Sequence, residues 1–70
     1  MNKGIPDVGT FWLHKSGTKY EVINVCNLHA NNERREEYPL LVIYRGDDGK
    51  VWSRGLASWY RSMKSLTEDM

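Results

Sequence analysis

Aromatic and arginine side chains gather in the last third of the chain. The stretch KVWSRGLASWY covers residues 50–60 and is followed directly by Arg61. Trp52 and Arg54 are two positions apart, so in a strand they point to the same face. An aromatic ring stacks on flat groups, and an arginine fork pairs with phosphate or carboxylate oxygens. The pattern predicts a binding surface, for which the sequence offers six side chains: Tyr44, Arg45, Trp52, Arg54, Tyr60 and Arg61.

The same aromatic residues also have a purely structural explanation. A chain of 70 residues buries only about 60% of the surface that its unfolded form exposes, and each aromatic side chain can remove roughly 150–250 Å² from water. Under one interpretation Trp52 is half exposed and Arg54 stacks on or beside it. Under the other, Trp52 belongs to the core and the arginine stem runs past it to pair with Glu21 or Glu36. The sequence leaves both interpretations open.

Signals for catalysis or metal binding are weak. Cys26 and His29 have a C-x-x-H spacing, but only His14 adds a further soft ligand, and a structural zinc site needs four. Asp47 and Asp48 stand between two glycines, which is typical of a turn rather than of a catalytic pair. Neither a G-x-S-x-G nor a phosphate-binding glycine motif occurs. We therefore expect a protein that is not an enzyme and has no metal and no cofactor.

Composition and charge narrow the classes of partner. Ten basic and nine acidic residues give a net charge of +1, whereas nucleic-acid binders typically have a clear basic excess. The single cysteine excludes an internal disulfide and fits a reducing compartment. No apolar run approaches the roughly 18 residues that span a bilayer, and the first residues lack the apolar segment of a signal peptide. We expect a cytoplasmic protein without a membrane partner.

Hydrophobic patterning predicts an irregular lead-in over residues 1–9 and one domain over residues 10–70. Within the domain, four runs rich in β-branched and aromatic residues predict strands, over residues 10–14, 19–27, 40–45 and 50–54. The turn sequences K-S-G-T and G-D-D-G join them into two hairpins. The third strand is apolar on both faces and is therefore expected in the middle of the sheet.

The segments between and after these strands differ in character. Residues 28–38 are polar, which predicts a long solvated loop or a single helical turn. Leu56, Trp59 and Met63 have helical spacing, so a short helix or 3₁₀ turn is expected to lay them on the sheet and to leave Tyr60 and Arg61 exposed. Residues 64–70 add a brief closing strand or fray. The predicted fold is mainly β: a small SH3-like, partly open barrel of four to five strands.

Two stretches carry a resemblance to a known family. GTFWLHKSGTKYEVINV and YPLLVIYRGDDGKVWSRGLASWYRSM resemble a family of short uncharacterised proteins from tailed bacteriophages, prophages and some bacteria. That family has an H-K-x-G-x-x-Y-x-V hairpin, a variable loop, a V-x-Y strand, a glycine-containing turn and a W-x-R-P segment. The similarity spans residues 9–66. Gly55 stands where the family usually has proline, which leaves the entry into the following turn looser. The residues that match are His14, Lys15, Gly17, Tyr20, Val22, Tyr44, Gly49, Trp52, Arg54, Trp59 and Met63.

The resemblance implies a small β-barrel in the cytoplasm of a bacterial host and brings no catalytic residues. We expect a non-catalytic binding module that modulates a host process, such as a defence response, by binding a host protein or by sequestering a small nucleotide-like signalling ligand. Capture of a nucleotide requires a homo-oligomer with a shared pocket, since one small barrel offers little concavity. Two alternatives remain: a nucleic-acid-binding barrel that stacks bases on Trp52, Tyr44 and Arg54, or a structural or virion accessory protein.

Overall fold

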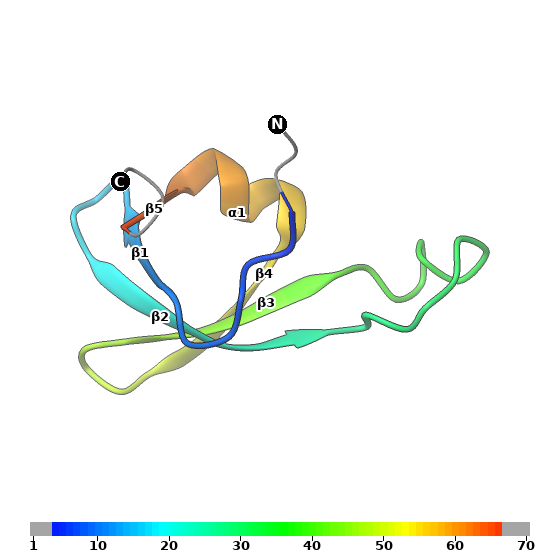
Figure 1. Cartoon of the computed structure of the whole chain (residues 1–70), viewed down its shortest axis with the longest axis horizontal. Coiled ribbons are helices and arrows are strands. Elements are labelled where there is room, and N and C mark those ends of the chain that lie inside the picture. Colours follow the sequence, from blue (N-terminus) through cyan, green and yellow to red (C-terminus); the bar gives the residue numbers. More distant parts are fainter. Residues whose placement is uncertain (1–3, 67–70) are drawn as a thin grey trace.

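The structure is a computed structural model and describes residues 4–66. Its strands form one antiparallel sheet in the order β4-β3-β2-β1-β5, so β4 and β5 are the edges and the sheet does not close (Figure 1). The predicted fold class is confirmed: a mainly β, partly open small barrel with one short helix. Its elements are β1 (Phe11–His14), β2 (Lys19–Cys26), β3 (Leu41–Gly46), β4 (Val51–Gly55), α1 (Leu56–Ser62) and β5 (Met63–Ser65).

Both predicted hairpins form, and each turns at a glycine with a left-handed backbone. Gly17 has φ 99° and Gly49 has φ 83°. Their N–H groups donate to the carbonyls of His14 and Gly46 at 2.8 and 3.0 Å. A residue with a Cβ atom loses roughly 1–2 kcal/mol in this conformation. Glycine at these two positions therefore fixes where each hairpin reverses.

The ends of the chain follow the sequence pattern as far as the structure describes them. Residues 4–9 form no helix or strand, as expected for the lead-in, and residues 1–3 lie outside the described range. The closing strand forms as β5 and begins at Met63, one residue earlier than predicted. The rest of that prediction, residues 67–70, lies outside the described range. The polar segment forms a series of turns rather than a helix.

A bulge in β2 bends the sheet. The pairing of β2 with β3 shifts register between Val22 and Asn24, which leaves Ile23 as the extra residue. Val22 and Val25 are three positions apart and would lie on opposite faces of a regular strand. Because of the bulge both are buried, at 0% and 8% exposure. Bulges also increase strand twist, so this one lets a small sheet curve around its core.

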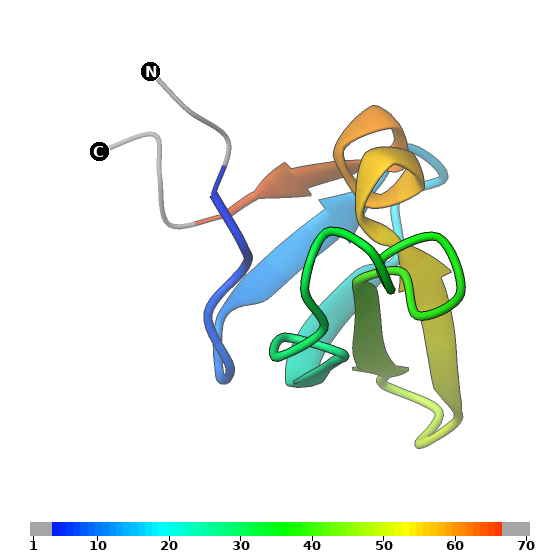
Figure 2. The same ribbon diagram turned by 90° about the vertical axis from the view of Figure 1, so that its right-hand side faces the viewer.

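The core lies between the sheet and α1, which packs against β3, β4 and β5 (Figures 1 and 2). We call the side of the sheet that α1 covers the inner face. Trp59 of α1 is fully buried there. Its ring contacts those of Trp12 and Tyr44 edge to face, with centroids 5.4 and 5.0 Å apart. The predicted stripe is confirmed for Leu56 and Trp59, which face the sheet from α1. Met63 is also in the core, but as the first residue of β5 rather than on the helix.

One prediction about α1 is wrong. Tyr60 was expected in solvent but is half-buried, and its ring meets that of Trp12 edge to face at 5.8 Å. Its hydroxyl also donates to the carbonyl of Gly4. Tyr60 follows Leu56 by four residues, so both lie on one side of the helix, and Trp12 is wide enough to reach past the stripe. Arg61 is exposed, as expected.

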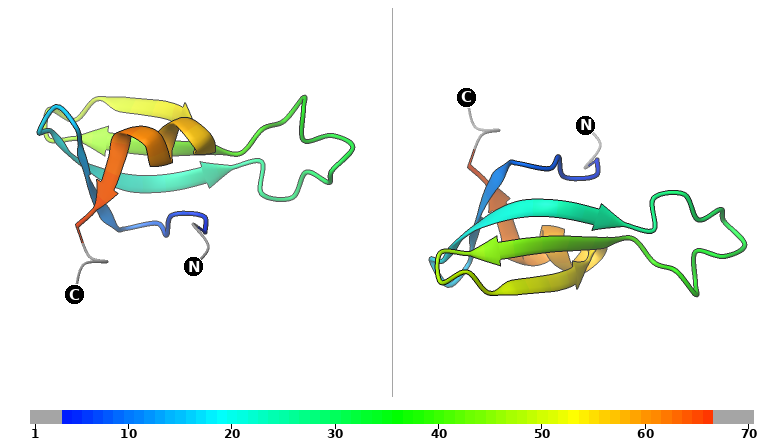
Figure 3. Two further views of the ribbon diagram at one scale, coloured as in Figure 1. Left: turned by 90° about the horizontal axis from the view of Figure 1, so that it is seen from above. Right: turned by 90° about the horizontal axis from the view of Figure 1, so that it is seen from below.

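Residues 27–40 form a loop that extends well beyond the sheet (Figure 3). Arg35 closes this loop from within. Its guanidinium donates to the carbonyls of Asn27 and Ala30 at 2.6 and 2.7 Å, and to that of Tyr38 at 3.4 Å. At the neck, the side-chain amide of Asn27 donates to the carbonyl of Pro39 at 2.7 Å. Every acceptor in this network is a backbone carbonyl.

We expect Arg35→Ala to open the loop while the barrel stays folded. The substitution removes charge-assisted hydrogen bonds, each worth about 1.5–3 kcal/mol, from a segment remote from the core. Hydrogen exchange followed by mass spectrometry should show faster exchange in residues 28–38 and unchanged exchange in β2 and β3. Arg34→Ala is the matched control, because Arg34 contacts the Tyr38 ring instead, at 4.9 Å. Equal exchange in both variants would contradict the assigned role of Arg35.

Candidate functional site

Arg54 joins β4 to α1 through hydroxyl groups. Its Nε donates to the hydroxyl of Tyr44 at 3.3 Å. Its Nη1 donates to Oγ of Ser58 at 3.0 Å and to Oγ of Ser62 at 3.3 Å. The two serines are four residues apart and therefore lie on one side of the helix, the side next to β4. The strand and the helix together fix the direction of the guanidinium.

Among the described residues, no carboxylate pairs with the charge of Arg54. The side chain is half-buried, and all its hydrogen-bond partners in residues 4–66 are neutral hydroxyls. Within the same residues the one salt bridge joins Arg45 to Glu21, at 3.2 Å. Arg54 thus follows neither sequence-based interpretation: it is not paired with Glu21 or Glu36, and hydroxyls hold it in place of a stacked ring. A partly buried cation of this kind favours an incoming anion.

Trp52 is a surface residue of the inner face. It lies opposite Tyr44 in the β3–β4 ladder, and Arg54 lies opposite Val42. Tyr44 and Val42 are buried, at 5% and 0% exposure, whereas Trp52 is 52% exposed. The difference arises because β4 is an edge strand, so nothing covers Trp52 from the far side. A large aromatic surface therefore lies on the same face of β4 as Arg54, two residues away.

The structure brings together three of the six predicted site residues, namely Tyr44, Trp52 and Arg54. The Tyr44 ring itself is buried, so its contribution is the hydroxyl that accepts from Arg54. Arg45 points to the opposite face because side chains alternate along a strand. Tyr60 lies on the other flank of α1, against Trp12. Sequence reasoning missed Ser58 and Ser62, although their spacing of four on a predicted helix was the available signal.

A cavity of about 340 Å³ lies between the β1–β2 hairpin and the segment where α1 ends and β5 begins. Ser62 lines it and also accepts from Arg54. Lys15 and Arg61 contribute positive charge, and none of the described residues that line the cavity is acidic. Arg61 thus lies beside this cavity rather than beside Trp52. The described residues that line the cavity are Leu13, His14, Lys15, Gly17, Arg61, Ser62, Met63 and Lys64.

His14 and Ser16 form a serine–histidine contact of the kind found in catalytic pairs. Ser16 Oγ lies 2.8 Å from His14 Nδ1, and the Ser16 N–H donates to the same nitrogen at 3.0 Å. His14 is the half-buried last residue of β1, and Ser16 lies in the exposed turn that follows it. In the part of the chain that is described, no carboxylate bonds to the ring to orient it, as a triad requires. The contact stabilises the turn.

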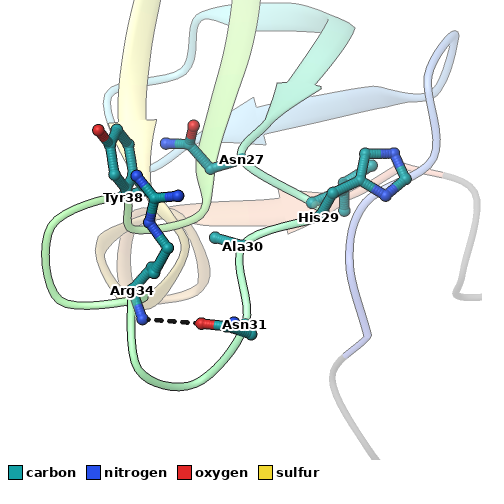
Figure 4. Close-up of a pocket in the computed structure, with 7 residues that line it drawn as sticks. Asn27, His29, Ala30, Asn31, Arg34 and Tyr38 are labelled. Carbon is teal, nitrogen blue, oxygen red and sulfur yellow. Dashed lines mark hydrogen bonds between the residues drawn. The ribbon is translucent and has the colours of Figure 1, made fainter.

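A second cavity, of about 540 Å³, lies within the long loop (Figure 4). Asn27, which opens the loop, has a left-handed φ of 67°. The Asn31 side chain accepts from the Arg34 N–H at 3.0 Å, and the Arg34 guanidinium covers the Tyr38 ring. The cavity is formed by the loop's own residues and offers neutral amides with one arginine already stacked. Its lining consists of Asn27, Leu28, His29, Ala30, Asn31, Arg34 and Tyr38.

Comparisons with protein-family models, with curated proteins and with solved structures found no match. Among the described residues, no group of three or more histidine, cysteine, aspartate or glutamate side chains is arranged to hold a metal ion. No helix within residues 4–66 is long and apolar enough to cross a membrane. The functional conclusion therefore depends on the geometry of one group of residues. We call this group the cluster; it consists of Arg54, its hydroxyl partners on Tyr44, Ser58 and Ser62, and Trp52 on the same strand face.

Proposed function

We propose that this protein is a non-catalytic binding module of phage or prophage origin that acts in the bacterial cytoplasm by sequestering a small nucleotide-like ligand. One observation carries the proposal: a half-buried arginine without a carboxylate partner in residues 4–66 lies on the same face of β4 as a half-exposed tryptophan, two residues away. The phage origin rests on the family resemblance alone. The ligand class rests on the chemistry of the cluster.

Each part of a nucleotide has a matching group at this site. The charge of Arg54 suits a phosphate, and the Ser58 and Ser62 hydroxyls, which accept from Arg54, still have their own O–H groups to donate to that anion. The exposed face of Trp52 suits a purine or pyrimidine ring, and stacking of one base on an aromatic side chain is worth about 1–3 kcal/mol. Further phosphates would lie toward Lys15 and Arg61 in the adjoining cavity.

The test measures ligand affinity directly. Native mass spectrometry of the protein purified from bacterial lysate should show a bound species of a few hundred daltons. Titration calorimetry then compares nucleoside monophosphates, diphosphates and cyclic dinucleotides with the matching nucleosides and with inorganic phosphate. We expect only compounds that carry both a base and a phosphate to bind well. Equal affinity for the nucleosides, or no binding by any nucleotide at millimolar concentration, contradicts the proposal.

Two substitutions link that affinity to the cluster. Arg54→Lys keeps the charge but loses the fork, and Trp52→Ala removes the stacking surface. Each should weaken binding at least about tenfold, equivalent to 1.4 kcal/mol, with little effect on folding. Arg45→Lys is the matched control for Arg54→Lys, because Arg45 lies on the opposite face of the sheet. Binding that survives both cluster substitutions places the ligand elsewhere, and the loop cavity becomes the next site to examine.

A host protein is the second candidate ligand. The observation that favours it is the adjacent exposure of Val51 and Trp52, at 55% and 52%, on an edge strand. Edge strands pair readily with an extended segment of another chain. A co-purifying polypeptide that is lost with Trp52→Ala supports this candidate. Binding of single-stranded oligonucleotides that weakens steeply with salt would instead support a nucleic-acid-binding barrel.

A further inference from the structure

The outer edge of β4 carries unpaired backbone groups in a regular pattern. The N–H of Gly46 donates to the carbonyl of Lys50, and the N–H of Leu56 donates to that of Leu40. Hydrogen-bonded pairs alternate with non-bonded pairs along an antiparallel ladder. The backbone groups of Trp52 and Arg54 therefore face β3, and those of Val51, Ser53 and Gly55 face outward. Figures 2 and 3 show no other segment of residues 4–66 beside this edge.

This edge lacks the usual devices that prevent pairing. Natural edge strands are blunted by proline, lysine, bulges or very short length. β4 has five residues, V-W-S-R-G, and its ladder with β3 is regular throughout. Its single charge, on Arg54, turns inward to the hydroxyls of α1. The other edge differs, because β5 has three residues.

We infer that two copies of this chain pair antiparallel through β4, with Ser53 on the two-fold axis, and that Trp52 of each copy then lies opposite the partner's Arg54 in one shared binding groove. The outward backbone groups are self-complementary about Ser53, since Ser53 pairs with the partner's Ser53 and Val51 with the partner's Gly55. Such an isologous contact closes after two copies.

The side chains fit this register on both faces. On the outer face, Val51 is 55% exposed, and a Cβ atom placed at Gly55 meets nothing within 4 Å. The partner's Val51 can therefore cover that glycine. On the inner face, residues directly opposite have Cβ atoms about 4.5–5.5 Å apart. This distance lets the partner's indole ring cover the aliphatic stem of Arg54, whose guanidinium stays bonded to the hydroxyls of Tyr44, Ser58 and Ser62.

The pairing adds a second copy to the proposed ligand site. Only its predicted response to ligand rests on the proposed function. One copy presents its tryptophan and arginine on one face of an open strand edge, whereas in the dimer the shared groove also has a tryptophan of one copy opposite an arginine of the other. A ligand that contacts both copies binds the dimer more tightly than the monomer, so adding it should strengthen dimerisation. The dimer itself is expected without ligand, since its backbone and side-chain contacts need none.

The first test uses Ser53→Pro. The Ser53 N–H faces away from β3, so proline there removes no hydrogen bond within one copy and edge strands accept it. It does block pairing with a second copy. Analytical ultracentrifugation of ligand-free protein should show twice the chain mass for the wild type and for the matched control Ser53→Ala, and a monomer for Ser53→Pro. A wild type that stays monomeric at millimolar concentration, or a dimer that survives Ser53→Pro, overturns the inference.

A second test determines which residues of the two copies lie opposite each other, and it does not require β4 to accept a proline. In a Cys26→Ala background, Ser53→Cys places two thiols across the axis, where hydrogen-bonded partners have Cα atoms about 5.5 Å apart, within the range of a disulfide. Val51→Cys is the control, because its two thiols would be about 13–14 Å apart along the strands. We expect mild oxidation to cross-link only the Ser53→Cys protein. Equal cross-linking of both variants, or of neither, contradicts the register. If the protein forms the dimer without ligand but binds no nucleotide, the proposed nucleotide-binding function is wrong and the pairing through β4 still holds.

Discussion

Trp59→Ala is expected to lower the free energy of unfolding by about 3–5 kcal/mol, the usual cost of truncating a buried aromatic side chain. Trp59 is fully buried and touches both Trp12 and Tyr44, so its removal separates α1 from the sheet. Domains of this size have a total stability of about 0.05–0.15 kcal/mol per residue. A loss of this size is a large part of the total, so urea denaturation followed by circular dichroism should show the unfolding midpoint at a much lower urea concentration than in the wild type.

Trp52→Ala is the matched control for that measurement. The same substitution at a half-exposed position leaves no cavity in the core, and surface changes usually stay within about 0.5 kcal/mol. Trp59→Phe should fall between the two. It keeps a ring and also removes the Trp59 Nε1 group, which is buried without a hydrogen-bond partner in the described structure. Similar midpoints for Trp59→Ala and Trp52→Ala would mean that α1 does not pack as described.

Tyr44→Ala is expected to cost a similar amount, about 3–5 kcal/mol. The Tyr44 ring lies in the middle of the aromatic core, with centroids 5.0 Å from those of both Tyr20 and Trp59. Thermal unfolding followed by near-ultraviolet circular dichroism should show early loss of the aromatic signal. A variant that melts like the wild type would show that the core does not depend on this ring.

Tyr44→Phe separates the two roles of this residue. Phenylalanine keeps the ring in the core but removes the hydroxyl that accepts from Arg54, a loss of about 0.5–1.5 kcal/mol for one hydrogen bond. We expect stability close to that of the wild type and weaker nucleotide binding, because Arg54 loses one of its anchors. Unchanged binding would mean that Ser58 and Ser62 alone suffice to hold the guanidinium.

The strands and turns were predictable because their signals are local. A glycine that needs a left-handed backbone and flanking β-branched residues specify a hairpin without reference to the rest of the chain. The bulge at Ile23 was not predictable in this way. It reflects the need of Val22 and Val25 to share one core, and that need exists only once the sheet has curved around α1.

The candidate site was predictable in part. Strand periodicity correctly placed Trp52 and Arg54 on one face, but it could not say that β4 is an edge and that Trp52 is therefore exposed. The partners of Arg54 were also missed. One interpretation paired Arg54 with Glu21 or Glu36, whereas α1 folds back and supplies hydroxyls from Ser58 and Ser62 instead. The phage origin and the cytoplasmic location stay predictions.

Because Arg35 closes the long loop through backbone groups, the loop can accept amino-acid substitutions during evolution. The acceptors of Arg35 are backbone carbonyls, which every amino acid provides, so the loop keeps its shape under most substitutions at neighbouring positions. Exposed residues such as Leu28, His29 and Glu33 are then free to vary without cost to the barrel. The protein carries a surface on which new specificities can arise by single substitutions, separate from the one that β4 and α1 build.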